Sequence, residues 1–431
     1  MLVATFILYI KRGESSLRVL RILFLSIVLF LITVNGYAQN DKIQLVWHNA
    51  EDAVMYELEI ANCPIKNNKK ASAKQIVYST TKISTPGIEL NTALFKGEKL
   101  KKLYYRVRPL DLDKNPRAAF SDPIALSKGV LNPVKPTITS SLKKNHPLPL
   151  YPVYSWIPVL GADSYEVEIL SAPPEKPNGT EASKYRIRSS IVQGGFGFDY
   201  YDAHAYVEPG TFYWRVLALD ENKKPIGKYS DASPLPVKTG SRKWAVFGDS
   251  ITHGGGAISN PPSDDRFEYV SYLPFPVKNL GRSGDTSEAM VERFEHDVLP
   301  FKPQYLFILG GSNSIRGGVS GEEVIESLEA IKGKCEENGI TPIFLTLPPV
   351  NPDRIQRVFD QSTAENWQVE LAKVNEFIRN QPYAIEIYSL LADENGILPV
   401  KYAQDGLHPD ISGKKIMADS IKNFLKNHPK L

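Results

Sequence analysis

The chain contains too few cysteines for a disulfide framework or a cysteine-rich metal site. Among its 431 residues only Cys63 and Cys335 are cysteines, and they fall in different candidate domains, so we expect two unpaired thiols. Histidine, aspartate and glutamate form no cluster with the spacing of a metal site. The sequence therefore predicts a protein that needs neither a metal nor another cofactor.

The chain also lacks a large charge excess of either sign. Its formal net charge is +3, and no long basic run follows the N-terminal segment, which argues against a nucleic-acid partner. The 42% hydrophobic and 23% charged residues are ordinary for a globular protein, and the length suggests two to four domains.

The main apolar run is shorter than an ordinary bilayer span. It covers 13 residues, Ile22 to Val34, which is typical of a signal-peptide core. Basic residues precede it, and Gly36 and Ala38 provide the small side chains that a signal peptidase inspects. We predict a signal peptide over residues 1–38, cleaved after Ala38, with no stable membrane insertion afterwards; an uncleaved anchor is the alternative. The mature protein would then be periplasmic, attached to the cell surface or secreted.

Residues 41–240 contain two similar halves that are offset by 109 residues. The matching segments are Trp47 with Trp156, Tyr56–Ile60 with Tyr165–Ile169, and Tyr105–Val107 with Trp214–Val216. Apolar and polar residues alternate in these segments, as they do in half-buried strands, and turn residues separate them. Each unit of about 100 residues fits one β-sandwich.

This part of the chain resembles tandem fibronectin type III domains in its early tryptophan, its Tyr-x-x-x-Ile segment and its Tyr/Trp-Arg-Val segment. The resemblance implies two all-β, immunoglobulin-like sandwiches, over residues 41–133 and 134–239. Such domains usually act as spacers or binding modules. We interpret Trp47, Trp156 and Trp214 as core residues, with a platform for stacking carbohydrate as the alternative.

After a short linker rich in proline and glycine, the pattern changes to strands that alternate with helices. Apolar runs at 244–247, 305–309, 342–347 and 384–388 predict strands, and helical spacing marks 322–337, 364–379 and 411–425. This alternation indicates a parallel sheet covered by helices over residues 242–431.

Four short blocks in this last region carry polar residues suited to catalysis. They are Gly248–Thr252, Asn279–Thr286, Gly310–Asn313 and Asp405–His408. The first three follow predicted parallel strands, so we expect them at one edge of the sheet, where open α/β folds bind ligands.

Together these blocks supply the parts of an acyl-transfer site. Ser250 would be the nucleophile, His408 its general base, and Asp405 the group that orients the imidazole. The N–H groups of Ser250 and Gly281 and the side-chain amide of Asn313 would form the oxyanion hole. Each block alone also fits a turn or a helix cap, but their combination and order favour catalysis.

The last domain resembles the SGNH hydrolases, or GDSL-type esterases and lipases, through Gly-Asp-Ser at 248–250, Gly281, Gly-x-Asn at 311–313 and Asp-x-x-His at 405–408. The resemblance implies a flavodoxin-like α/β/α fold, with the roles given above for Ser250, Gly281, Asn313 and His408. It also implies ester hydrolysis without a metal. One departure is Ser314, where the third block often continues with an acidic residue.

The predicted substrate is a carboxylic ester, either a small molecule or a glycan. Exported members of the family with accessory β domains often remove acetyl groups from glycans, so an acetylesterase acting on carbohydrate is the preferred interpretation. Asp249, Arg282 and Ser312 are the weaker candidates for substrate contacts, and Arg316 is a further polar residue compatible with such a substrate. The alternatives are a lipid or thioester acylhydrolase, or a glycan-binding surface protein whose hydrolase domain is inactive. His253 is interpreted as a helix-start or solvent-exposed residue, with a second base or a substrate contact as the alternative.

Overall fold

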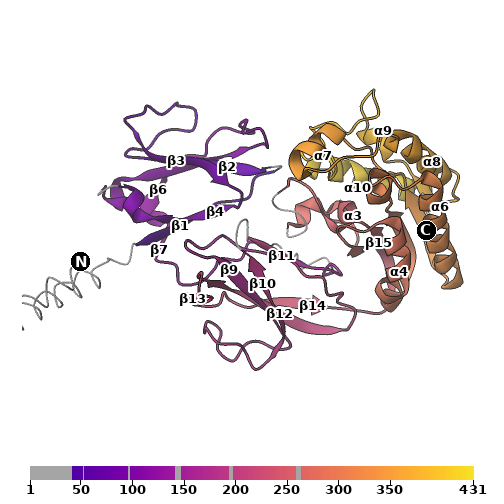
Figure 1. Ribbon diagram of the computed structural model, residues 1–431, viewed down its shortest axis with the longest axis horizontal. Helices are drawn as coiled ribbons and strands as arrows, with labels where there is room; N and C mark the ends of the chain where they lie inside the picture. The colour runs from indigo at the N-terminus through magenta and orange to yellow at the C-terminus, as the bar shows by residue number, and fades with distance from the viewer. Residues whose placement is uncertain (1–40, 52, 96–97, 141–146, 194–197, 259–263) are drawn as a thin grey trace, which may run out of the picture.

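The structure is a computed structural model that describes residues 41–51, 53–95, 98–140, 147–193, 198–258 and 264–431. The predicted signal peptide therefore lies outside the described residues. Two β-rich units precede an α/β domain, and Figure 1 shows these three parts in chain order, from indigo through magenta to yellow. Within the described ranges, no helix has the length and apolarity needed to cross a bilayer.

The first unit packs two antiparallel sheets against each other. One has the strand order β4-β1-β7 and the other β3-β2-β5-β6. The strands are β1 Lys42–Val46, β2 Met55–Ala61, β3 Ile76–Ile83, β4 Gly87–Asn91, β5 Tyr104–Leu110, β6 Ile124–Ala125 and β7 Val130–Leu131. Short 3₁₀ turns are η2 Thr92–Phe95, η3 Leu100–Lys102 and η4 Leu126–Lys128.

The second unit is also antiparallel. Strands β10, β9, β12 and β13 follow one another in its main sheet, with β14 paired to β12, while β11 and β8 form a second small sheet. The strands are β8 Val153–Ser155, β9 Ser164–Leu170, β10 Arg186–Gln193, β11 Asp199–Tyr201, β12 Gly210–Leu219, β13 Pro225–Ile226 and β14 Ser233–Val237.

The internal repeat of the sequence reappears in the strand register. Leu58 pairs with Val107 in the first unit, and Val167 pairs with Val216 in the second, which keeps the offset of 109 on both strands. The paired ions Arg106–Glu59 and Arg215–Glu168 are equivalent as well. The rings of Trp156 and Trp214 are fully buried, so they pack the core and present no face to a sugar.

The last domain is built on a parallel sheet with the strand order β16-β15-β17-β18-β19. Counted along the chain this order is 2-1-3-4-5, the flavodoxin-like arrangement. The strands are β15 Arg242–Gly248, β16 Lys278–Gly281, β17 Pro303–Leu309, β18 Thr341–Leu345 and β19 Ala384–Ile385. The central strands are apolar along their length because both of their faces are covered.

Eight described helices surround this sheet: α3 Ser250–His253, α4 Ser287–Val298, α5 Ser312–Arg316, α6 Gly321–Glu337, α7 Pro352–Phe359, α8 Trp367–Arg379, α9 Tyr388–Leu391 and α10 Ile411–Asn427. The 3₁₀ turns are η5 Asp265–Phe267, η6 Tyr269–Tyr272 and η7 Leu299–Phe301. Helix α6 packs between α4 and α8, whereas α10 packs against η5, η6 and α9. The strand expected at 384–388 is shorter than predicted, because Tyr388 begins α9.

The second unit and the α/β domain share one hydrophobic core. Leu150 and Tyr151, which precede β8, are buried with the apolar residues of the parallel sheet. Along the edge strand β16, Leu150 N–H donates to Asn279 O at 2.9 Å, and Lys278 Nζ donates to Leu148 O at 2.7 Å. The segment before β8 therefore covers the exposed edge of the sheet.

Candidate active site

Three of the four polar blocks meet where adjacent parallel strands end. Strand β15 lies between β16 and β17, and Gly248 pairs with both Gly281 and Leu309. The strand order reverses direction at β15, which is the point where open α/β sheets bind ligands. The blocks that follow these strands therefore share one edge of the sheet.

The nucleophile candidate sits on a tight turn that requires glycine before it. A Cβ on Gly248 would lie 2.0 Å from Leu309 O, so only glycine fits against the neighbouring strand. Helix α3 starts at Ser250, and the Asp249 side chain caps it by accepting from Ile251 N–H at 2.9 Å. This turn aims the Ser250 hydroxyl outward at the strand end.

The structure brings Ser250, His408 and Asp405 together. Ser250 Oγ lies 2.8 Å from His408 Nε2, and His408 Nδ1 lies 2.8 Å from Asp405 Oδ2. An ionised carboxylate only accepts, so Nδ1 carries the proton and Nε2 is free to accept from the serine hydroxyl. The three side chains thus have the contacts that the proton relay of a serine hydrolase requires.

The surroundings of Asp405 keep its carboxylate charged. Burial alone raises its pKa, but the nearby His408 ring and the N–H groups of Leu407 and His408 lower the pKa below its ordinary value. Both N–H groups donate to Asp405 Oδ1, at 2.7 and 2.8 Å. The tight turn that makes this possible passes through Gly406, whose φ is +82°.

Asn313 reaches the same site from β17. It lies in the first turn of α5, lines the catalytic cavity and donates from Nδ2 to Asp285 O at 2.9 Å. Ser250 N–H lies in the first turn of α3, where the helix offers no acceptor. Both residues line the cavity, and their role as oxyanion donors stays a prediction.

Gly281 does not face the cavity. Its N–H donates to Asn279 Oδ1 at 2.9 Å, and a Cβ at this position would lie 2.4 Å from His253 N. Gly284, three residues later, lines the cavity with a φ of +89° and open space beside it. The predicted role of Gly281 as an oxyanion donor is therefore corrected: Gly281 lets β16 pack against α3, and Gly284 is the glycine at the cavity.

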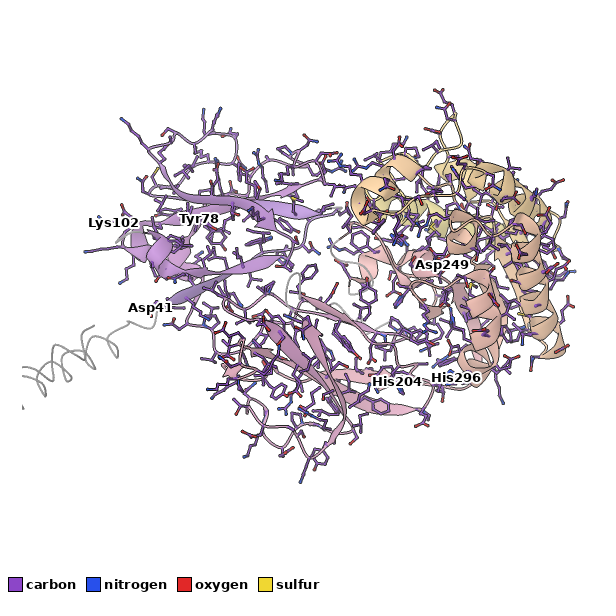
Figure 2. The ribbon with its side chains drawn as sticks, in the orientation of Figure 1. Asp41, Tyr78, Lys102, His204, Asp249 and His296 are labelled. Carbon is purple, nitrogen blue, oxygen red and sulfur yellow. The ribbon has the colours of Figure 1, made fainter. Side chains whose placement is uncertain are left out.

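The three weaker candidates for substrate contacts do not line the cavity in the described residues. Asp249 is buried at the start of α3, within the body of the domain (Figure 2). Arg282 turns toward the ring of Tyr151 and lies 3.8 Å from Asp285. Ser312 is buried beside Asn313 and faces a separate, smaller hollow. Of the three, only Asp249 has a side-chain hydrogen bond to the backbone beside the site, in the described residues.

His253 joins the site to the second β unit. Its Nε2 lies 2.6 Å from the carbonyl oxygen of Tyr151, which can only accept, so Nε2 carries a proton. Its Nδ1 accepts from Ser283 N–H at 3.2 Å and lies 2.9 Å from Ser283 Oγ. Burial lowers the pKa of His253 to about 4. The ring is thus a neutral link, and the structure places it neither as a helix-start surface residue nor as a base.

A buried lysine is hydrogen-bonded to the backbone of α3. Lys414 Nζ donates to Ile251 O at 2.5 Å, and burial lowers the pKa of this lysine to about 7. Burial likewise raises the pKa of Asp249 to about 6. Asp249 belongs to the Gly-Asp-Ser block of the sequence, but Lys414 does not stand out there, since a lysine in an amphipathic helix ordinarily points to solvent.

The catalytic cavity has a volume of about 300 Å³ and is lined by residues from six segments of the chain. Besides the triad and Asn313, its wall includes Tyr201, Arg316, Phe359 and Gln361. Tyr201 comes from β11 of the second β unit, 49 residues before the nucleophile. No sequence pattern near the catalytic blocks could have identified it, because only the docking of the domains brings it there.

Part of the chain is similar to known proteins. The sequence profile of the GDSL-like lipase/acylhydrolase family matches residues 246–416. The uncharacterized lipoprotein YqeF of Bacillus subtilis is 35% identical over 118 residues, which are 24% of this chain and 48% of that protein. The match thus spans about half the length of that relative.

The solved structures that resemble part of this chain include a lipase/acylhydrolase from Enterococcus faecalis, 19% identical, with a TM-score of 0.36 over 44% of this chain and 97% of that one. A GDSL-like lipase from Bacteroides thetaiotaomicron is 23% identical, with a TM-score of 0.34 over 43% and 89%. An acetyl-xylooligosaccharide esterase from Geobacillus Stearmophilus is 21% identical, with a TM-score of 0.33 over 43% and 95%. These likenesses carry no argument about substrate. Through its matched residues 246–416, the C-terminal region of the chain is a GDSL/SGNH hydrolase domain.

Proposed function

We propose that this domain is a serine hydrolase of carboxylic esters, with Ser250, His408 and Asp405 as its catalytic residues. The observation that carries the proposal is the continuous contact from Ser250 Oγ through the His408 ring to Asp405, with 2.8 Å at each step. A serine hydroxyl becomes an effective nucleophile only when a positioned base can take its proton.

The reaction follows from these positions. Ser250 Oγ attacks the ester carbonyl while His408 Nε2 takes the hydroxyl proton, and Asp405 stabilises the imidazolium that forms. The carbonyl oxygen gains a negative charge, which Ser250 N–H, Gly284 N–H and Asn313 Nδ2 stabilise. The imidazolium returns its proton to the leaving alcohol, and water then releases the acid from Ser250 by the same route.

The substrate we propose is a short-chain ester, with an acetyl group on a carbohydrate as the preferred case. A cavity of about 300 Å³ stands at the lower end of the range for ligand pockets. The ring of Tyr201, a partly exposed residue that lines the cavity, offers an apolar face of the kind on which sugar rings pack. We further propose that residues 1–38 export the protein and that the two β units are fibronectin type III-like.

The test compares p-nitrophenyl acetate with p-nitrophenyl octanoate, using the mature chain, its Ser250→Ala variant and a Ser389→Ala control at an exposed position. We expect acetate to be the better substrate and its turnover to fall by more than about 1,000-fold in Ser250→Ala alone. A preference for octanoate would instead indicate a lipid acylhydrolase. Turnover that persists without Ser250 would contradict the mechanism.

A further inference from the structure

Arg316 is the one cation among the described residues that line the catalytic cavity. It lies three residues after Asn313 in α5, and residues three apart share a helix face. Asn313 and Arg316 therefore line the same cavity, and Ser250 lines it as well. The guanidinium thus belongs to the wall that a bound ester would touch.

The hydrogen bonds of this guanidinium are largely unused. Both Nη atoms donate to one neutral acceptor, Gln361 Oε1, at 3.2 Å each. The Nε–H is buried and has no partner in the described structure. A guanidinium has five N–H donors, so most of them remain available for a ligand.

Other arginines buried in this chain have carboxylate partners. Arg293 pairs with Asp285 and with Asp297, the latter at 2.9 Å, and Arg215 pairs with Glu168 at 2.5 Å. Within the described ranges, by contrast, Arg316 forms no ion pair. Holding a half-buried guanidinium without a carboxylate partner costs free energy, unless a ligand supplies the missing negative charge.

Two carboxylates attract Arg316 electrostatically from beyond ion-pair distance, but both already bind other groups. Asp405 binds His408 and two backbone N–H groups, and Asp249 caps α3. Burial lowers the pKa of Arg316 despite the opposing charges of these two groups. The positive charge of Arg316 is therefore only partly compensated by the side chains around it.

We propose that Arg316 binds a carboxylate on the substrate, so that the enzyme prefers esters that carry an acidic group. This inference rests on the proposed ester hydrolysis and names the substrate class for the same site. Gln361 holds the guanidinium of Arg316 in place. The free N–H groups of this guanidinium form a planar fork that can donate two parallel hydrogen bonds to a carboxylate. The carboxylate belongs either to the alcohol part, as in an acetylated uronic acid, or to the acyl part, as in a hemisuccinate.

Two matched pairs of substrates distinguish a carboxylate on the alcohol part from a carboxylate on the acyl part. The first pair is an O-acetylated methyl galacturonoside and the same acetyl ester of methyl galactoside. The second pair is mono-(4-nitrophenyl) succinate and 4-nitrophenyl butyrate. We expect kcat/KM to favour the acidic member of one pair by roughly 10- to 100-fold, as for a hydrogen-bonded ion pair, and the preference to weaken from about 0.02 M to about 0.5 M salt.

Three variants test whether Arg316 causes that preference. Arg316→Gln should abolish the preference for the acidic substrate, Arg316→Lys should retain part of it, and Arg379→Gln, which removes an equal charge outside the cavity, should leave both the preference and the turnover of p-nitrophenyl acetate intact. If the wild-type enzyme treats both members of each pair equally, or if Arg316→Gln keeps the preference, the inference is overturned. Loss of Ser250-dependent p-nitrophenyl acetate turnover would instead remove the proposed function itself. The wild-type comparison decides the matter even if Arg316→Gln does not fold.

Discussion

At the residue scale, the charge on Asp405 determines which nitrogen of His408 is available to Ser250. The carboxylate accepts from Nδ1, so the lone pair lies on Nε2, next to the serine hydroxyl. The two backbone N–H groups on its other oxygen hold the carboxylate in this orientation. A neutral amide of the same shape would keep those contacts and reverse the tautomer.

We therefore expect Asp405→Asn to lower kcat by about 10⁴-fold with little change in KM. The new amide would donate to His408 Nδ1 and leave the proton on Nε2, where it cannot accept from Ser250. Steady-state kinetics on p-nitrophenyl acetate measure the loss, with the exposed Asp419→Asn as control and thermal unfolding as the check on folding. An activity near that of wild type would show that His408 works without Asp405.

Of the two glycines in the block Asn279–Thr286, we expect one to matter for packing and the other for catalysis. Gly281→Ala places a methyl group against the backbone of α3, so we expect the melting temperature to fall by several degrees. Gly284→Ala has room for the methyl group but strains a residue at positive φ, and we expect mainly a lower kcat because the oxyanion N–H shifts. Parallel measurements of melting temperature and kcat distinguish them. A larger catalytic loss in Gly281→Ala, at unchanged stability, would return the oxyanion role to Gly281.

The sequence predicts the residues that carry their own local motif and misses those that depend on packing. Ser250, Asn313 and His408 each follow a strand or lie in a recognisable turn, so the order of blocks was enough to find them. The two glycines of the second block look alike in the sequence, because the register of β16 against α3 decides which one reaches the cavity. Lys414 and Tyr201 depend on contacts across the fold, and no local pattern reveals them.

At the scale of elements, His253 fastens α3, the loop after β16 and the second β unit to one another. Only the neutral ring fits, because Nδ1 accepts from Ser283 N–H and Nε2 donates to Tyr151 O. The pKa of His253 is about 4 in the folded state and about 6.5 in an unfolded chain. Between these values the unfolded chain binds more protons, so the stability that this residue contributes falls as the pH drops.

This gives a prediction for His253→Gln, which keeps a donor and an acceptor but does not titrate. From pH 7.5 to 5 the wild-type protein should lose about 2 kcal/mol of unfolding free energy that the variant does not lose. Urea unfolding of both proteins across this range measures the difference, with the exposed His48→Gln as control. A difference between wild type and variant that stays constant with pH would contradict the neutral, buried assignment.

Strand β11 brings the second unit to the cavity through Tyr201, whose side chain is 41% exposed and packs edge-on toward His253 at 6.2 Å. We expect Tyr201→Ala to raise KM for acetylated oligosaccharides by about 10-fold, within the range of an aromatic contact. Turnover of p-nitrophenyl acetate should change little, because that substrate is too small to pack on the Tyr201 ring. Tyr201→Phe should behave like wild type. Equal effects on both substrates would indicate that Tyr201 supports the fold instead.

At the scale of the whole molecule, the two β units are similar in sequence and pairing but differ in how they meet the hydrolase domain. The first unit contacts it through polar groups, such as Asp113 with Arg354 at 3.2 Å and Asn49 with Asp264 at 3.0 Å. The second unit contributes buried apolar residues to the hydrolase core. His204 of the second unit and His296 of α4 meet at the same boundary (Figure 2). The sequence predicts two repeats but not this difference, since the joining residues lie outside the repeated strands.

The two units should therefore respond differently to deletion. A chain of residues 134–431 keeps the apolar junction, and we expect it to be soluble, active and somewhat less stable than residues 39–431. A chain of residues 242–431 loses Leu150 and Tyr151 from its core and the segment that covers β16. Burial of two such side chains is worth on the order of 5 kcal/mol, which is comparable to the whole stability of many domains.

We expect residues 242–431 to aggregate or to unfold at room temperature, with loss of Ser250-dependent turnover. Lys278 contributes to this outcome, because its buried Nζ would lose Leu148 O as acceptor, and burial already lowers the pKa of this lysine to about 7. Sedimentation, thermal unfolding and p-nitrophenyl acetate hydrolysis of the three chains test the argument. A soluble, fully active 242–431 chain would show that the second unit is a separable accessory. Failure of residues 134–431 would place the essential contacts in the first unit instead.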